Sequence, residues 1–210
     1  LFITDLQEKF QTAGIEVKNS NLGQLPETTW FHYPSDYLGD IVHSLNVRSD
    51  NLYAESVLRL LSLSAHEKGS AEKGIDIIRK YWQNYEADSL ELFMYDGSGL
   101  ARNNKVSAKY LNCVLKETAR DSLIGEYFVQ TLPLAGKEGS VATIMKHGEL
   151  PGELRLKSGS MSDVHAYAGY YTTPQNRYAI VVMINNYTCT RAQLKQKIST
   201  LLTQVLSKKE

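Results

Sequence analysis

The sequence predicts a mixed α/β protein of the α+β type, with an antiparallel sheet, flanking helices and a helical lobe. The first two-thirds of the chain repeat apolar residues mainly at helical spacing, and the last third holds three strand-like runs with short joins. Short joins favour antiparallel neighbours, because parallel strands need a crossover of about a dozen residues or more. We expect one domain over residues 1–210, with the helical lobe at roughly 35–148 and the sheet and last helix at roughly 150–208.

The first helices are predicted from apolar spacing and from the residues at their ends. Residues 2–13 have helical spacing, and Gly14 is a typical stop. Residues 15–33 are expected to be extended. Ser35 is then the expected N-cap of a helix over residues 37–45.

The same signals continue through the lobe. Further helices are predicted at residues 53–61, 75–85, 108–118 and 123–130. Ser70 and Ser107 are the expected N-caps of the second and third of these helices, because a serine hydroxyl accepts from the free N–H groups of a first turn. A strand is predicted at residues 90–95, followed by a turn at 96–99.

The sheet is predicted from three runs, at residues 154–157, 164–172 and 178–184. The third run is apolar at successive positions, so both of its faces should be covered. The last helix, over residues 194–206, carries a leucine-rich stripe typical of a helix lying on a sheet.

The composition argues against some classes of function. Twenty-three basic residues balance 23 acidic ones, so nothing indicates electrostatic capture of nucleic acid or of an anionic membrane surface. The five histidines lack metal-ligand spacing, and no metal or organic cofactor is indicated. Cys113 and Cys189 form no C-x-x-C motif, and the sequence leaves open whether they pair.

Three short motifs contain residues that could act in catalysis. They are Ser49-Asp50-Asn51, Asp96-Gly97-Ser98-Gly99 and Lys157-Ser158-Gly159-Ser160. Each also has a structural interpretation: Ser49 as a helix N-cap, the second motif as a turn, and Lys157 as an ordinary charge at a strand end.

Taken in order, the motifs resemble those of penicillin-binding proteins and serine β-lactamases, which share S-x-N and K-[ST]-G. The longer strings S-D-N-L-Y-A-E, D-G-S-G-L and L-P-L-A-G with a following G-S resemble low-molecular-mass D-alanyl-D-alanine carboxypeptidase/endopeptidases with inserted domains. The resemblance covers nearly the whole chain. It implies the DD-peptidase/β-lactamase-like fold, incomplete here, no cofactor, and a periplasmic or otherwise extracytoplasmic location.

The resemblance also implies roles for individual residues. Ser49 would relay protons, and Asn51 would hold the substrate peptide or a catalytic lysine. Lys157 and the hydroxyls of Ser158 and Ser160 would bind the terminal carboxylate of a peptidoglycan stem peptide, and the Ser160 N–H would be an oxyanion donor. The expected catalytic residues are Ser49, Asn51 and Lys157, and the expected substrate-binding residues are Ser158, Gly159 and Ser160.

The nucleophile motif of these families, S-x-x-K, should precede S-x-N. The one S-x-x-K of this chain, Ser70-Ala-Glu-Lys73, follows it instead, where Ser70 is the expected helix cap. We therefore expect that the chain begins after the nucleophile segment and is inactive alone. Two alternatives stay open: a non-catalytic peptidoglycan-binding module, and a β-lactamase or esterase on the same fold.

The expected partners follow from the resemblance. They are the peptidoglycan stem peptide as substrate and β-lactams as pseudo-substrates. In the family, two more strands lie beside the last strand. If these are missing, the apolar edge at residues 178–184 is unpaired, and we expect it to pair with a second copy in a homodimer or to be covered by the N-terminal segment.

Overall fold

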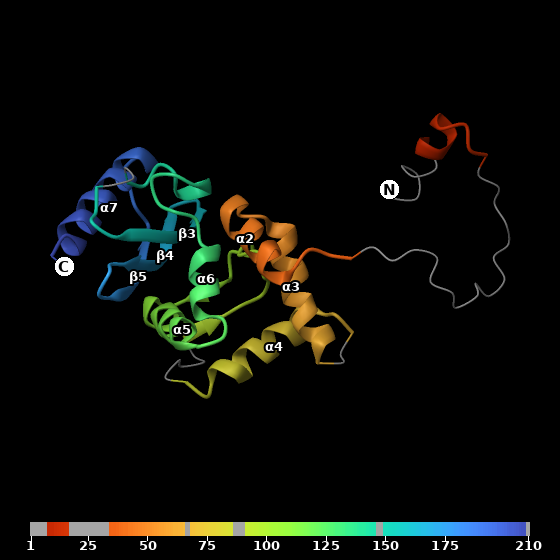
Figure 1. Ribbon diagram of the computed structural model, residues 1–210, viewed down its shortest axis with the longest axis horizontal. Coiled ribbons are helices and arrows are strands. Elements are labelled where there is room, and N and C mark those ends of the chain that lie inside the picture. The colour runs from red at the N-terminus through yellow and green to blue at the C-terminus, as the bar shows by residue number, and fades with distance from the viewer. Residues whose placement is uncertain (1–7, 17–33, 66–67, 86–90, 146–148, 209–210) are drawn as a thin grey trace. The chain divides into compact units, whose positions relative to one another are not determined.

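The computed structural model describes residues 8–16, 34–65, 68–85, 91–145 and 149–208, and it divides the chain into two units. In the first unit, Leu1–Ser35, residues 8–12 are helical, as predicted. The beginning of that helix and the predicted extended stretch at 17–33 lie outside the described residues. The second unit, Asp36–Glu210, contains the elements that follow (Figure 1).

Five helices form most of the lobe in the described residues: α2 (Leu38–Arg48), α3 (Asn51–Ser64), α4 (Ala71–Trp82), α5 (Ala108–Arg120) and α6 (Gly125–Thr131). Two predicted N-caps are confirmed: Ser70 Oγ accepts from the Lys73 N–H at 3.1 Å, and Ser107 Oγ accepts from the Tyr110 N–H at 2.9 Å. The predicted cap Ser35 is wrong, because α2 begins after Tyr37, too far along the chain for Ser35 to reach its first turn.

A small antiparallel pair, β1 (Leu92–Phe93) and β2 (Lys105–Val106), lies between α4 and α5 in sequence. The loop that joins them is the predicted turn, and it is closed by side chains. Asp96 accepts from the N–H groups of Gly99 at 2.6 Å and Ala101 at 2.5 Å. Glu55 of α3 accepts from two further N–H groups of the turn. The structural interpretation of this motif is therefore confirmed.

The main sheet is antiparallel, in the order β3 (Glu153–Met161), β4 (Val164–Thr172) and β5 (Arg177–Asn185). Its register aligns Lys157 of β3 with Ala168 of β4, and Ala168 with Val181 of β5. The three predicted strands and their antiparallel pairing are confirmed. The predicted end of the first strand at Lys157 is wrong, because β3 runs on to Met161 and so contains Ser158, Gly159 and Ser160.

Helices cover both faces of the sheet, as the apolar third strand predicts (Figure 1). The last helix, α7 (Arg191–Leu206), buries its leucine-rich stripe against one face. On that face the cluster includes Leu156, Tyr167, Ile180, Leu194, Ile198, Leu202 and Leu206. The opposite face packs on α5 and α6 through Leu115, Val129, Tyr170, Ala179 and Val181.

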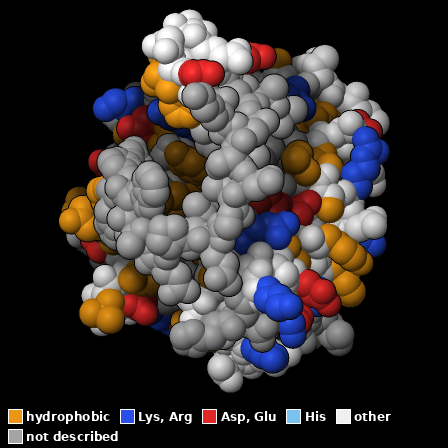
Figure 2. All heavy atoms as spheres, turned by 90° about the vertical axis from the view of Figure 1, so that its right-hand side faces the viewer, with side chains coloured by type: hydrophobic (Ala, Val, Ile, Leu, Met, Phe, Trp, Pro, Cys, Tyr) orange, Lys and Arg blue, Asp and Glu red, His pale blue; other side chains and the backbone are white. Residues whose placement is uncertain are grey.

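The described surface shows the balance of charges that the composition indicates. Acidic and basic side chains are interspersed on the described part of the face that Figure 2 shows. Among the described residues, no helix is both long and apolar enough to span a membrane. Cys113 and Cys189 do not form a disulfide.

Candidate active site

The first part of the site is the corner between α2 and α3. Helix α2 ends at Ser49, which adopts the left-handed conformation with φ 56° and ψ 50°. The next residue, Asp50, is the N-cap of α3 and accepts from the Tyr53 N–H at 3.0 Å. The interpretation of Ser49 as an N-cap is therefore wrong, and its hydroxyl is available for a tertiary contact.

Two contacts fix this corner against the rest of the unit. The buried amide of Asn46 donates to the Thr131 hydroxyl of α6 at 2.9 Å. The 3-10 turn η2 (Gly139–Val141) approaches the end of α2 so closely that a Cβ on Gly139 would lie 2.2 Å from the Val47 carbonyl oxygen. Both contacts hold Ser49 beside β3.

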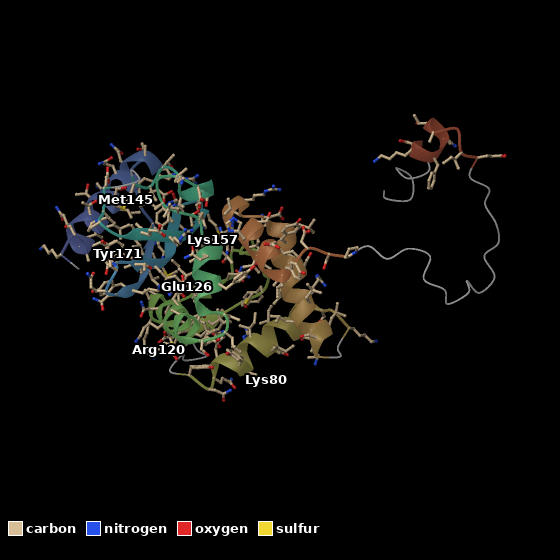
Figure 3. The ribbon with its side chains drawn as sticks, in the orientation of Figure 1. Lys80, Arg120, Glu126, Met145, Lys157 and Tyr171 are labelled. Carbon is tan, nitrogen blue, oxygen red and sulfur yellow. The ribbon has the colours of Figure 1, made fainter. Side chains whose placement is uncertain are left out.

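The second part of the site is Lys157, near the middle of β3. Its ammonium donates to Ser49 Oγ at 2.7 Å and to the Ser158 carbonyl oxygen at 2.9 Å. Lys157 lies where β3 faces α2 (Figure 3), and it is half-buried. Burial lowers the pKa of the ammonium below its usual value. The structure thus joins two predicted site residues that are 108 positions apart in sequence.

The outer edge of β3 is partly covered. The Leu156 N–H donates to the Pro133 carbonyl at 3.0 Å, and the Ala135 N–H donates to the Leu154 carbonyl at 2.8 Å. Since alternate residues of a strand direct their N–H groups to the same side, the N–H groups of Ser158 and Ser160 point to this edge too. No strand within the described residues covers the edge past Leu156.

Sequence reasoning missed one residue of this edge. Ser158 Oγ lies 2.7 Å from Ser140 Oγ, in the η2 turn 18 positions earlier. The string L-P-L-A-G with its following G-S was the available signal, but it gave Ser140 no role.

Among the described residues, Asn51 and Gly159 make no hydrogen bond to the Lys157 ammonium. Asn51 opens α3 two positions after Ser49, and its side chain is exposed. Gly159 is exposed, and a Cβ there would meet nothing within 4 Å.

Ser70 serves the start of α4. Its hydroxyl accepts from the Lys73 N–H, and its own N–H donates to Ser62 Oγ at 3.0 Å. The Lys73 side chain is exposed, so this S-x-x-K is occupied as a helix cap.

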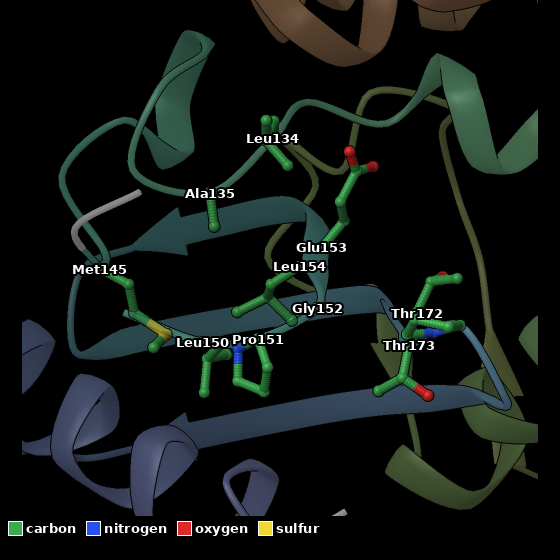
Figure 4. A pocket seen from close by; sticks show the side chains of 11 residues that line it. Leu134, Ala135, Met145, Leu150, Pro151, Gly152, Glu153, Leu154, Thr172 and Thr173 are labelled. Atoms are coloured by element: carbon green, nitrogen blue, oxygen red, sulfur yellow. The ribbon is translucent and has the colours of Figure 1, made fainter. Parts of the chain in front are cut away.

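A hollow of about 470 Å³ lies at the start of β3 and the end of β4 (Figure 4). Its lining includes Leu134, Met145, Pro151, Leu154 and Thr172, but neither Ser49 nor Lys157. In the part of the chain that the structure describes, no three His, Cys, Asp or Glu side chains gather to hold a metal ion.

The fold places the chain among proteins with the DD-peptidase/β-lactamase-like fold. Penicillin-binding protein 4 from Haemophilus influenzae matches 97% of this chain and 48% of its own, with a TM-score of 0.77 and 24% identity. The TLA-1 extended-spectrum β-lactamase matches 81% of this chain and 64% of its own, with a TM-score of 0.58 and 16% identity. These likenesses confirm the predicted fold.

A sequence profile of the D-Ala-D-Ala carboxypeptidase 3 (S13) family matches residues 1–208, and the chain belongs to that family. The D-alanyl-D-alanine carboxypeptidase DacB of Haemophilus influenzae is 27% identical over 206 residues, covering 94% of this chain and 42% of the relative. The D-alanyl-D-alanine carboxypeptidase of Actinomadura sp. R39 is 25% identical over 193 residues, covering 86% of this chain and 36% of the relative. The chain therefore spans less than half the length of these relatives.

Proposed function

We propose that this chain is the C-terminal part of the catalytic domain of a serine-type D-Ala-D-Ala carboxypeptidase/endopeptidase acting on peptidoglycan stem peptides. The observation that carries the proposal is the 2.7 Å contact between Lys157 Nζ and Ser49 Oγ. Family membership adds support, because two relatives are named D-alanyl-D-alanine carboxypeptidases.

The chemistry assigns each group a role. A serine hydroxyl outside these 210 residues attacks the carbonyl of the penultimate D-Ala, and its oxygen forms the acyl bond. The carbon–nitrogen bond breaks, and the amine of the leaving D-Ala takes a proton through Ser49. Water then attacks the acyl-serine and releases the shortened peptide.

Lys157 and the β3 edge bind the substrate. The ammonium suits a peptide that ends in a carboxylate, and the Ser158 and Ser160 hydroxyls add donors for it. The substrate lies along the uncovered edge as an added strand, with the Ser160 N–H directed at the developing oxyanion. Asn51 holds the peptide from the α3 side.

We assign the nucleophile to an S-x-x-K segment outside the chain, because Ser70 Oγ is engaged as the cap of α4. The chain alone then binds stem peptide without turning it over. The complete protein acts outside the cytoplasm, where peptidoglycan lies.

β-Lactams are proposed as pseudo-substrates of the complete protein. A structure of Haemophilus influenzae penicillin-binding protein 4 complexed with a β-lactam matches this chain at 25% identity and a TM-score of 0.75. A β-lactamase would instead release the opened lactam rapidly, so turnover of a D-Ala-D-Ala peptide against that of a penicillin separates these two activities.

Fluorescent penicillin labelling tests the proposal. We expect no covalent label on the 210-residue chain, and a label on the chain extended upstream to include S-x-x-K. In the extended protein, Lys157→Met should abolish hydrolysis of a D-Ala-D-Ala peptide, while Ser70→Ala should not. A label on the short chain that disappears in Ser70→Ala would contradict the assignment, and an extended protein that binds peptide without hydrolysis would favour a binding module.

We further propose that the 210-residue chain by itself forms a homodimer through the open edge of β5. Within the described residues β5 pairs only with β4, and an apolar groove of about 500 Å³ runs beside it between α5 and α7. Leu201 and Val205 of α7 line this groove and are 52% and 47% exposed. An uncovered apolar edge favours pairing with another strand.

A further inference from the structure

Among the described residues of the loop before β3, Ser140 meets a proposed substrate-binding side chain. Its Oγ lies 2.7 Å from Ser158 Oγ. The Ser158 carbonyl oxygen also accepts a hydrogen bond from the Lys157 ammonium, at 2.9 Å. Ser158 therefore links the ammonium on one side to Ser140 on the other.

The position of Ser140 is built into the fold. The loop closes on itself, since the Gly136 N–H donates to the Val141 carbonyl at 3.0 Å and the Leu134 N–H donates to the Glu138 carboxylate at 2.8 Å. Gly139, with φ +50°, lies against the end of α2. The backbone that carries Ser140 is thus held in place by its contact with the α2–α3 corner, which carries Ser49.

Counting donors shows what the site has left for a ligand. The lysine ammonium has three N–H donors, of which Ser49 Oγ and the Ser158 carbonyl accept two. Two hydroxyls in contact have two protons, and their mutual bond uses one. One N–H and one O–H remain, the number that the two oxygens of a single carboxylate need.

We propose that Ser140 is a further substrate-binding residue, whose hydroxyl acts with Ser158 and Lys157 to hold the C-terminal carboxylate of the stem peptide. This inference rests on the proposed function. It adds a residue from outside the segment Lys157 to Ser160. The carboxylate site would then be formed by the η2 turn together with β3.

Peptide binding to the 210-residue chain tests the inference without catalysis. We would titrate N-acetyl-D-Ala-D-Ala and its C-terminal amide into the wild type, Ser140→Ala, Ser140→Thr and the control Thr143→Ala, following amide shifts by NMR. Thr143 lies on the same loop but bonds Lys195, at 2.8 Å, on the α7 side. Ser140→Ala should weaken binding of the carboxylate peptide about tenfold and leave the amide peptide unchanged. Ser140→Thr and Thr143→Ala should bind like the wild type.

The outcomes separate the two proposals. If the wild type prefers the carboxylate and Ser140→Ala keeps this preference in full, the role of Ser140 is refuted while the proposed function stands. If Ser140→Ala weakens both peptides equally, Ser140 is structural and the inference is again refuted. If the wild type does not distinguish the two peptides, the carboxylate site is absent and both proposals fail.

Discussion

At the residue scale, Ser49 is held in an unfavourable backbone conformation. The described residues contain three non-glycine positions with positive φ, and the other two are Asp163 and Asn186. Aspartate and asparagine adopt this region far more readily than other non-glycine residues, while a serine there costs about 1 kcal/mol. The chain keeps a strained residue at the point where its hydroxyl reaches Lys157, as is common where a side chain is needed for function.

This strain predicts that two substitutions of Ser49 differ in their free energy of unfolding. Ser49→Gly should be more stable than Ser49→Ala by about 1 kcal/mol in urea unfolding, because glycine adopts positive φ without a Cβ clash. Both variants should bind N-acetyl-D-Ala-D-Ala more weakly, since both lack the hydroxyl. A Ser49→Gly variant with wild-type affinity would show that the hydroxyl has no part in the site.

The lowered pKa of Lys157 predicts a pH dependence of binding. Burial disfavours the charged ammonium, so its pKa in the folded chain lies below the usual 10.5. Affinity for the carboxylate peptide should therefore fall as pH rises through that lowered value, before an ordinary lysine would lose its proton. Stability linked to Lys157 should rise over the same interval, because the unfolded chain still binds the proton there.

NMR titrations of the peptide at successive pH values, with the amide peptide as control, measure this dependence. Affinity for the carboxylate peptide that stays constant up to pH 10.5 would contradict the role of the ammonium. A parallel loss for the amide peptide would assign the effect to unfolding.

At the element scale, β3 performs two tasks with alternate residues. Leu154 and Leu156 point into the core with α7, while Lys157 points toward the lobe. The loop before β3 pairs with its first half and leaves the second half open. The strand is therefore anchored at one end and available to a ligand at the other.

The η2 turn predicts a matched pair of glycine substitutions. Gly139 and Gly99 both have positive φ, but a Cβ on Gly139 would lie 2.2 Å from the Val47 carbonyl, whereas one on Gly99 would meet nothing within 4 Å. Gly99→Ala should cost about 1 kcal/mol from the backbone alone, and Gly139→Ala about 2–3 kcal/mol with weaker peptide binding. Equal urea midpoints for the two variants would show that η2 does not support the α2–α3 corner.

The sequence predicted the local features of these elements better than their contacts. Ser70 and Ser107 were predictable caps because a cap bond spans three residues. Ser35 failed because α2 begins without a side-chain cap: its N-cap is Tyr37, which makes no capping hydrogen bond through its side chain. Ser140 lies in the L-P-L-A-G…G-S string, but that string indicated no role for it, since its partner Ser158 is reached only through the folded loop.

At the scale of the whole molecule, the site depends on segments that are far apart in the chain. No spacing rule relates Ser49 to Lys157, and the expectation that they share a site came from the order of the motifs. The strands and the covered faces of the sheet were predictable from apolar pattern, because the pattern itself reports burial. Within the described residues β5 pairs only with β4, and the resemblance was the reason to expect an unpaired edge there.

The open edge of β5 predicts a homodimer, and a charge introduced beside that edge should disrupt it. Leu201→Glu places a carboxylate beside the β5 groove and should shift any dimer to monomer in sedimentation velocity. Leu123→Glu, at a leucine that is 89% exposed away from the groove, is the matched control and should sediment like the wild type. A wild-type chain that is monomeric at the highest soluble concentration would contradict the homodimer.

The most direct test of the account is a double-mutant cycle on Ser49 and Lys157, measured as affinity for N-acetyl-D-Ala-D-Ala. If the hydroxyl and the ammonium act as one site, Ser49→Ala, Lys157→Met and the double variant should be non-additive, with a coupling free energy of about 1 kcal/mol or more. Losses that add within about 0.5 kcal/mol would show that the two side chains act independently, and would contradict the site described here.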